Sequence, residues 1–319
     1  MLISSAYQEI VLPQKDELLI YSGETTFLEE LTDDFILFID SGSGGVEAKK
    51  VHFIDGAMRV LHLSPLQGKD GILRPMLGGH IGAARLCLKN RHLEREDYQL
   101  QRVLVLPREV NCPSENSTYK SYGIEEKNLS SDYESNKLQL YNFITEEMKK
   151  MELLLANCNF EFIIIDGLLN KGLTDSKNQT ILGVVKTIKE FYLDTNKHNQ
   201  LITMKEGFRS RVFLITTSDF PRASWYIRLN GDYTSGYEGI IRVEISLELF
   251  KKVGINFINQ VSKFLFTIRY LLKDYFRQSS TLLPLLEAER HLYSLFDSPL
   301  SLHYFFKNKL KEAGIEPFR

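Results

Sequence analysis

The sequence predicts an α/β fold: a mixed β-sheet flanked by helices, followed by a helical C-terminal portion. Two runs of β-branched and aromatic residues predict the centre of the sheet, one ending at Asp40 and the other at Asp166. Continuous apolar runs of this kind are typical of strands that are buried on both faces. A third observation predicts the helical portion after Leu247, because apolar residues recur there at helical spacing.

Length and composition limit the classes of protein to which the chain can belong. Its 319 residues suffice for a single domain spanning residues 1–319, and its 43% apolar and 25% charged residues are ordinary for a soluble globular protein. The net charge of −2 argues against a protein that coats nucleic acid without specificity, although it permits a local basic groove. No signal peptide or membrane span is predicted, and three cysteines without metal-ligand spacing favour a reducing cytoplasm.

Strands and one long helix are predicted between the two aspartates. Residues 51–64, which alternate between apolar and polar, and residues 101–106 indicate strands. Residues 111–136 are rich in Ser, Asn, Glu and Tyr, which predicts a surface insertion or a mobile loop. A helix should then lead into the second aspartate strand. Its apolar stripe consists of Tyr141, Ile144, Met148, Met151 and Leu155.

After the second aspartate the pattern alternates between helix and strand. A short helix is predicted near residues 176–182, and strands are predicted in residues 212–217, 225–229 and 240–245. From Leu247 the chain should be mainly helical. The apolar stripe of this portion consists of Phe257, Val261, Phe264 and Ile268.

The two strand ends carry the first candidate site. A charged aspartate at the end of a buried strand costs free energy unless something compensates it. If the ends of Asp40 and Asp166 lie side by side, they can hold divalent cations of the kind that cleave phosphodiesters. Asp near Gly is also an ordinary turn signal, which explains either aspartate alone equally simply. Both together, with a further carboxylate on a helix, favour the metal site.

Two predicted helices can supply further carboxylates. On the helix before the second aspartate, Glu147 and Glu152 flank the apolar stripe at about −60° and +80° from Ile144, so either could reach the edge of the core. On the helix of residues 284–296, Glu289 lies inside the apolar stripe. A carboxylate there needs an arginine or a metal to balance its charge. We favour a place in the active site and keep the ion pair as the alternative.

Taken in order along most of the chain, these residues resemble the NurA family of nucleases. The resembling segments are Asp40-Ser41-Gly42-Ser43, the helix with Glu147, and residues 162–168, 181–187, 225–229, 239–244 and 283–290. There are three departures. The first motif has Asp-Ser-Gly-Ser where the family has Asp-Gly-Ser, and Glu289 stands where many members have His. The family's tyrosines before the last helix are replaced by residues such as Thr281 and Leu283.

The resemblance implies an RNase H-like fold and a DNA exo- or endonuclease that hydrolyses phosphodiesters by a two-metal mechanism. It implies that carboxylates bind Mn²⁺ or Mg²⁺ and carry the catalysis: Asp40, Glu147, Asp166 and Glu289. It further implies that Lys186 faces a DNA phosphate. The implied partners are DNA, a second copy in a homodimer and a HerA-like hexameric ATPase, in DNA-end processing or defence against foreign DNA.

Two points stay open in the sequence. Arg228 and Arg242 end short apolar runs on predicted neighbouring strands, where they could bind DNA phosphates or pair with carboxylates such as Glu244. The altered C-terminal motif also permits a catalytically degenerate member that binds DNA or scaffolds the ATPase. A guide-dependent PIWI-like protein is a third possibility, and the shortness of the chain argues against it.

Overall fold

The structure is a computed structural model, and it describes residues 19–20, 25–29, 34–39, 50–67, 71–107, 113, 115–125, 132–157, 160–169, 171–173, 179–188, 190–216, 220–231, 236–270 and 280–315. An 11-stranded mixed sheet forms its centre, and a separate parallel pair joins β1 (Leu19–Ile20) to β9 (Glu190–Phe191). The predicted α/β class and the helical C-terminal portion are confirmed.

The middle of the sheet has the strand order of an RNase H-like fold. Three long antiparallel strands come first: β3 (Lys50–Gln67), β4 (Leu73–Lys89) and β5 (His92–Pro107). β7 (Phe162–Asp166) then pairs parallel with β3, and β8 (Thr180–Val185) pairs parallel with β7. The order β5-β4-β3-β7-β8 therefore places β3 and β7 side by side at the centre.

The rest of the sheet continues beyond β8 in antiparallel strands. The order is β13 (Ile240–Ser246), β12 (Arg222–Arg228), β10 (Phe208–Ser210) and β2 (Ile36–Phe38), while β11 (Phe213–Ile215) also pairs with β12. Thus β2 lies at the edge of the sheet, and four strands separate it from β7. The expectation that the strands ending at the two aspartates lie side by side is wrong.

The apolar character of β2 has another cause. Phe35 and Ile36, at the start of this run, join a cluster formed with β11, β12 and α2 (Thr195–Ile202), while Phe38 is exposed. The run therefore covers the edge of the sheet and does not form its centre. Asp40 itself lies outside the described residues.

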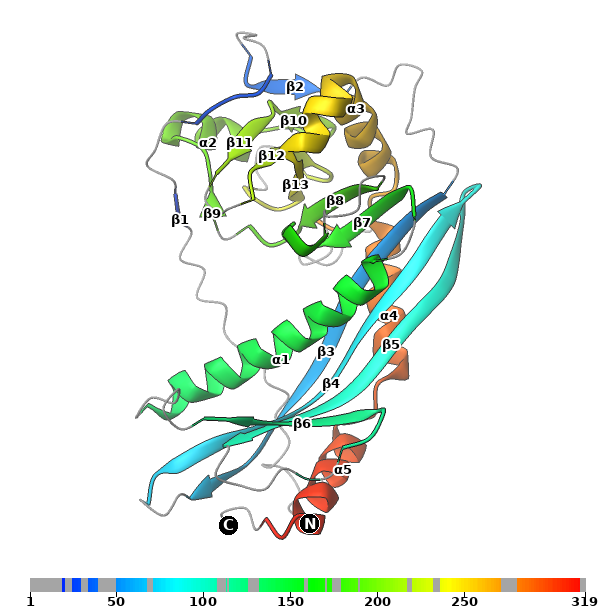
Figure 1. Cartoon of the computed structure of the whole chain (residues 1–319). Helices are drawn as coiled ribbons and strands as arrows, with labels where there is room; N and C mark the ends of the chain where they lie inside the picture. Colours follow the sequence, from blue (N-terminus) through cyan, green and yellow to red (C-terminus); the bar gives the residue numbers. More distant parts are fainter. Residues whose placement is uncertain are drawn as a thin grey trace.

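Helices cover both faces of the long strands, as Figure 1 shows. α1 (Tyr133–Ala156) packs its predicted apolar stripe on one face, and Asp132 caps its first turn by accepting a hydrogen bond from the Ser135 N–H. α4 (Leu283–Leu295) packs Ala288 and Leu292 on the opposite face. α1 and α4 therefore sandwich the central strands.

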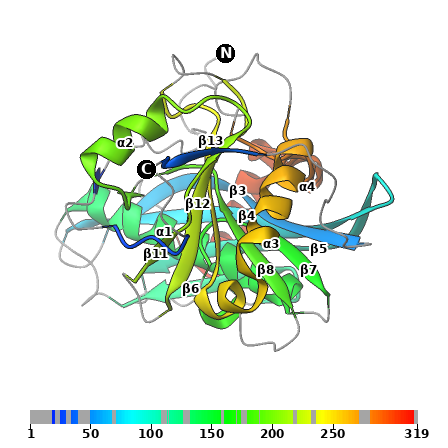
Figure 2. The ribbon, with the colours of Figure 1, turned by 90° about the horizontal axis from the view of Figure 1, so that it is seen from above.

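Two more helices complete the layers. α5 (Pro299–Glu312) packs on the far ends of β3, β4 and β5. α3 (Leu247–Thr267) covers β12 and β13, and Figure 2 shows α2 on the other side of β12. Within the described part of the chain, no helix is both long and apolar enough to cross a membrane. The cytoplasmic location and the single domain stay predictions.

Two sequence expectations fail in the connections. Residues 119–124, inside the predicted surface insertion, form β6 (Tyr119–Ile124), which pairs parallel with β5. Its polar composition concealed a strand whose Tyr119 is fully buried against Phe306 of α5. The helix predicted near residues 176–182 is also wrong, because β8 begins at Thr180.

Candidate active site

Two aspartates meet at the centre of the sheet. β3 and β7 run parallel in a register that pairs Phe53 with Ile164 and Ile54 with Ile165. Asp55 and Asp166 follow at the next positions, so they stand beside each other on neighbouring strands. Asp55 is only 3% exposed, and both residues precede a glycine.

A lysine joins the two aspartates. The Nζ atom of Lys186 lies 3.2 Å from Oδ2 of Asp55 and 2.9 Å from Oδ2 of Asp166. Lys186 directly follows β8, which pairs with β7, so the sheet itself delivers the ammonium to this point. Burial lowers the pKa of Lys186, but the charges of both aspartates outweigh it and raise that pKa.

A third carboxylate comes from α1. Glu152 is buried and accepts a hydrogen bond from the backbone of Gly56, which follows Asp55 on β3. Its carboxylate occupies the space that a side chain at position 56 would fill, so only glycine allows this approach. Burial, and then the charge of Asp166, raise the pKa of Glu152 to about 8.

A fourth carboxylate comes from α4. Glu289 repels Asp55 and attracts Lys186 electrostatically. Burial, followed by the charge of Asp166, raises the pKa of Asp55 well above its ordinary value. The charges of Glu152 and Glu289 act in the same direction, against the opposing effect of Lys186. We call Asp55, Glu152, Asp166 and Glu289 the carboxylate site.

The carboxylate site holds more negative charge than its lysines neutralise. Lys186 interacts electrostatically with all four acids, and Lys149 adds an attraction for Glu152 that exceeds that of Lys186. Burial first, and then the charge of Asp166, keep the pKa of Asp55 raised, and an added cation would stabilise the ionised form of such a group. Carboxylate oxygens are hard donors of the kind that Mg²⁺ and Mn²⁺ prefer. The residues present therefore fit such a cation.

A buried network fixes the turn that follows Asp166. Glu244 of β13 pairs with Arg222 at 3.0 Å and with Arg242 at 3.1 Å. Its Oε2 also accepts a hydrogen bond from the Leu169 N–H at 3.3 Å, while Arg222 donates to the Leu169 carbonyl. The N–H and the carbonyl of Leu169 are thus both hydrogen-bonded to side chains of β13 and β12. The position of Asp166 depends on this network through the short intervening turn.

The structure brings together only part of the set that the sequence predicted. Asp166, Glu289 and Lys186 meet in one place. Glu147 does not join them: it accepts a 2.6 Å hydrogen bond from Tyr122 of β6 and pairs with Lys150. The reserve candidate Glu152 takes that place, because the two positions differ by about 140° around the helix.

Asp55 is the residue of the carboxylate site that the sequence did not predict. Residues 51–64 alternate between apolar and polar, so this aspartate looked like one solvent-facing position of a strand. The signal was present nevertheless. Ile54-Asp55-Gly56 repeats the order Ile165-Asp166-Gly167, and it stands on the strand that β7 pairs with.

The two predicted DNA-binding arginines are internal. Arg228 is fully buried and donates hydrogen bonds to the carbonyls of Ile202, Gly236 and Glu238. Arg242 is buried in its pair with Glu244. Neither guanidinium can contact DNA from these positions, so the prediction is wrong for both. The ion pair that the sequence left open for Arg242 is the one observed.

No protein-family model matches the chain, and neither does any curated protein. Among solved structures, the chain is similar to the NurA nuclease from Sulfolobus solfataricus, with 14% identity and a TM-score of 0.48 over 87% of this chain and 89% of that one. It is also similar to endonuclease V from Ciona intestinalis, solved with an inosine-containing DNA, with 12% identity and a TM-score of 0.36 over 79% of this chain and 87% of that one.

Proposed function

We propose that the chain is a metal-dependent nuclease that hydrolyses DNA phosphodiesters at the carboxylate site. One observation carries the proposal: four acids from β3, α1, β7 and α4 interact electrostatically with a single, partly buried lysine at the centre of the sheet. Two of these carboxylates, Asp55 and Glu152, are buried, and buried carboxylates with so little counter-charge destabilise a fold unless a cation or a substrate uses them.

The ligand set follows from the same geometry. Asp55 and Asp166 would hold the cations, with Glu152 and Glu289 completing the set. When bound, Mn²⁺ or Mg²⁺ would stabilise charge on the attacking and leaving oxygens of the phosphodiester. This assignment replaces Asp40 and Glu147 of the sequence argument, and it keeps Asp166 and Glu289.

Two residues of the chain have further roles in this proposal. Lys186 presents a permanent positive charge beside the aspartates, where it would hold the phosphate next to the bond that breaks. Burial, and then the charge of Asp166, raise the pKa of Glu152 to about 8, so Glu152 would release its proton when a cation binds, as its place in the ligand set requires.

The sequence resemblance to the NurA family supports the same activity. Asp55-Gly56-Ala57 follows the family's Asp-Gly-Ser order more closely than Asp40-Ser41-Gly42-Ser43 does. On that resemblance we also propose a homodimer that docks on a HerA-like hexameric ATPase and acts in DNA-end processing or defence against foreign DNA. A single nuclease domain over residues 1–319 belongs to this proposal.

The test is cleavage of linear single- and double-stranded DNA with Mn²⁺, Mg²⁺ or EDTA, with and without the partner ATPase. We expect EDTA to stop cleavage, and Asp55→Asn to reduce the rate by more than the ~100-fold typical of residues that only support a ligand. Asp40→Asn is the matched control and should keep most of the activity. If Asp40→Asn lost cleavage and Asp55→Asn retained it, the active site would lie at Asp40, after the edge strand β2, and the proposal for Asp55 would be wrong.

One observation favours a second function, a DNA-binding or scaffold subunit that does not cut. The ammonium of Lys186 already lies between Asp55 and Asp166 and supplies the positive charge that a cation would bring. In this case the folded, ATPase-bound protein would cleave no DNA under any metal condition. Mn²⁺ would also leave its melting temperature unchanged.

A further inference from the structure

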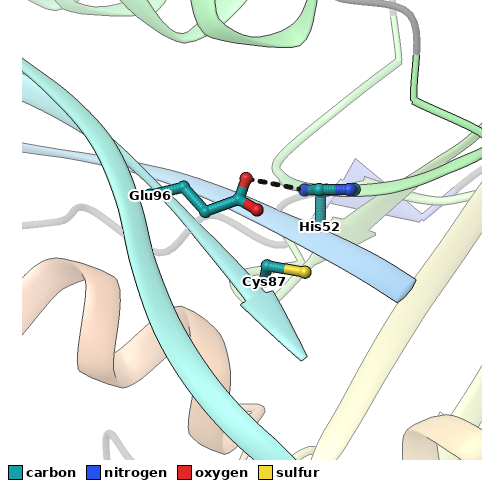
Figure 3. A group of neighbouring side chains, drawn as sticks. All are labelled: His52, Cys87 and Glu96. Carbon is teal, nitrogen blue, oxygen red and sulfur yellow. Dashed lines mark hydrogen bonds and ion pairs between the residues drawn. The ribbon is translucent and has the colours of Figure 1, made fainter. Parts of the chain in front are cut away.

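Among the described residues, a second group of metal-ligating side chains lies apart from the carboxylate site. His52 of β3, Cys87 of β4 and Glu96 of β5 each offer one ligand atom, and these three atoms lie within 4.8 Å of one another. Figure 3 shows the three side chains pointing toward one another from neighbouring strands. The group therefore combines nitrogen, sulfur and oxygen donors.

The strand register builds this group. His52 and Cys87 are directly paired across β3 and β4, so their side chains share one face of the sheet. On β5 the register shifts: Arg85 pairs with Asp97 and Leu86 with Arg95, which leaves Glu96 as the extra residue of a β-bulge. Bulges re-aim side chains at functional places. Here the bulge turns Glu96 toward the other two donors.

Burial and polarity make the group unusual for a sheet face. His52 and Cys87 are 3% and 1% exposed, whereas the Glu96 side chain is partly open to solvent. His52 Nδ1 lies 3.1 Å from Glu96 Oε2.

The simplest competing explanation is an ion-pair network without metal. Arg85 Nε lies 3.2 Å from the same Glu96 oxygen that contacts His52. Yet Arg85 also lies 3.6 Å from Asp97, donates to the Leu155 carbonyl and packs over an aromatic ring. Arg85 therefore keeps Asp97 as a counter-ion if Glu96 turns away from it to bind a cation. A thiolate and a carboxylate would then balance a divalent charge, with Arg85 as the outer support of Glu96.

We propose that His52, Cys87 and Glu96 form a second metal site for a borderline-soft divalent cation such as Zn²⁺, with a fourth position open to solvent on the Glu96 side. Mixed sulfur and nitrogen donors select Zn²⁺ over Mg²⁺ or Mn²⁺. The site is independent of the carboxylate site: His52 precedes Asp55 by three positions, so the two face opposite sides of β3, about 10 Å apart along the strand. A cation here would link β3, β4 and β5 next to the C-terminal end of α1.

The test is a titration of the full chain with Co²⁺, because thiolate-bound Co²⁺ absorbs in a charge-transfer band that carboxylate-bound Co²⁺ lacks. The starting protein would carry Cys112→Ser and Cys158→Ser, so that Cys87 is its only thiol. We expect the saturated band to have the intensity of one thiolate-bound Co²⁺ per chain and to disappear when Zn²⁺ displaces Co²⁺. Adding Cys87→Ser should abolish the band.

Two further variants keep the test independent of folding and of nuclease activity. His52→Gln should weaken Co²⁺ binding at least tenfold in a protein whose circular dichroism is unchanged. Asp55→Asn should keep the band, because it alters only the carboxylate site. No charge-transfer band in the single-thiol protein, or a band that survives Cys87→Ser, would overturn the proposal.

Discussion

Two groups of charged side chains lie on the same sheet, and their charge excesses have opposite signs. Around Glu244 one carboxylate is paired with two arginines and accepts a backbone hydrogen bond as well. In the carboxylate site four acids interact with one partly buried lysine, Lys186, and Glu152 also interacts with Lys149. In the first group the arginines outnumber the carboxylate, so it needs no added cation. The second leaves acids whose charge the chain does not balance, and this difference separates a structural network from a site that needs something added.

The largest expected effect is on stability, and it has opposite signs in the two groups. Glu244→Gln preserves the shape but leaves two buried arginines without their shared counter-charge. Removing one partner of a buried pair typically costs about 3–5 kcal/mol. Urea denaturation should therefore show Glu244→Gln destabilised by this order.

Asp55→Asn is the matched change in the carboxylate site. It removes a buried charge whose pKa burial and the charge of Asp166 already raise, so the metal-free protein should be as stable as the parent or more so. Equal losses of stability in Glu244→Gln and Asp55→Asn would remove the distinction between the two groups. Cleavage should fall in both variants: directly for Asp55→Asn, and through the turn at Leu169 for Glu244→Gln.

The next effect is a pH dependence that the carboxylate site alone should produce. Burial, and then Asp166, raise the pKa of Glu152 from 4.5 to about 8 in the folded protein. Between pH 4.5 and about pH 8 the folded state therefore keeps a proton on Glu152 that the unfolded state has released. The stability it contributes is fully present below about pH 4.5 and is lost as the pH rises through 8, by on the order of a few kcal/mol.

Thermal unfolding of metal-free protein between pH 5 and pH 9 would measure this slope. Glu152→Gln should flatten it, because the amide does not titrate. Mn²⁺ should flatten it too, since a bound cation favours the ionised carboxylate. Glu244→Gln serves as the contrast and should keep the slope of the parent. A metal-free protein that is equally stable across this range would contradict the charge imbalance proposed for the site.

The sequence predicted the elements better than it predicted how they come together. The apolar stripe of α1 and the Asp166 strand were recognised correctly, because periodicity and β-branched runs are local signals. The order of strands is not local. The run before Asp40 and the run before Asp166 look alike, and only long-range pairing places the first at the edge and sets Asp55 beside the second. The inward position of Glu289 could be predicted because it depends only on which face of one helix is apolar.

The choice between Glu147 and Glu152 was not recoverable from the sequence, since both flank the same stripe. What decides it is the glycine on the partner strand. Gly56 leaves room for the carboxylate of Glu152, whereas Glu147 meets Tyr122 near the other edge of the sheet. A side-chain position on a helix becomes part of a site only when the facing strand has space for it.

The smallest expected effect tests this last distinction. Glu147→Gln keeps an acceptor for the Tyr122 hydroxyl and loses the pair with the exposed Lys150, so its stability should change by about 1 kcal/mol or less. Its DNA cleavage and its Mn²⁺ dependence should equal those of the parent. Glu152→Gln should lower cleavage at saturating Mn²⁺ in the same assay. If Glu147→Gln were inactive and Glu152→Gln active, the space at Gly56 would not determine which glutamate of α1 belongs to the site.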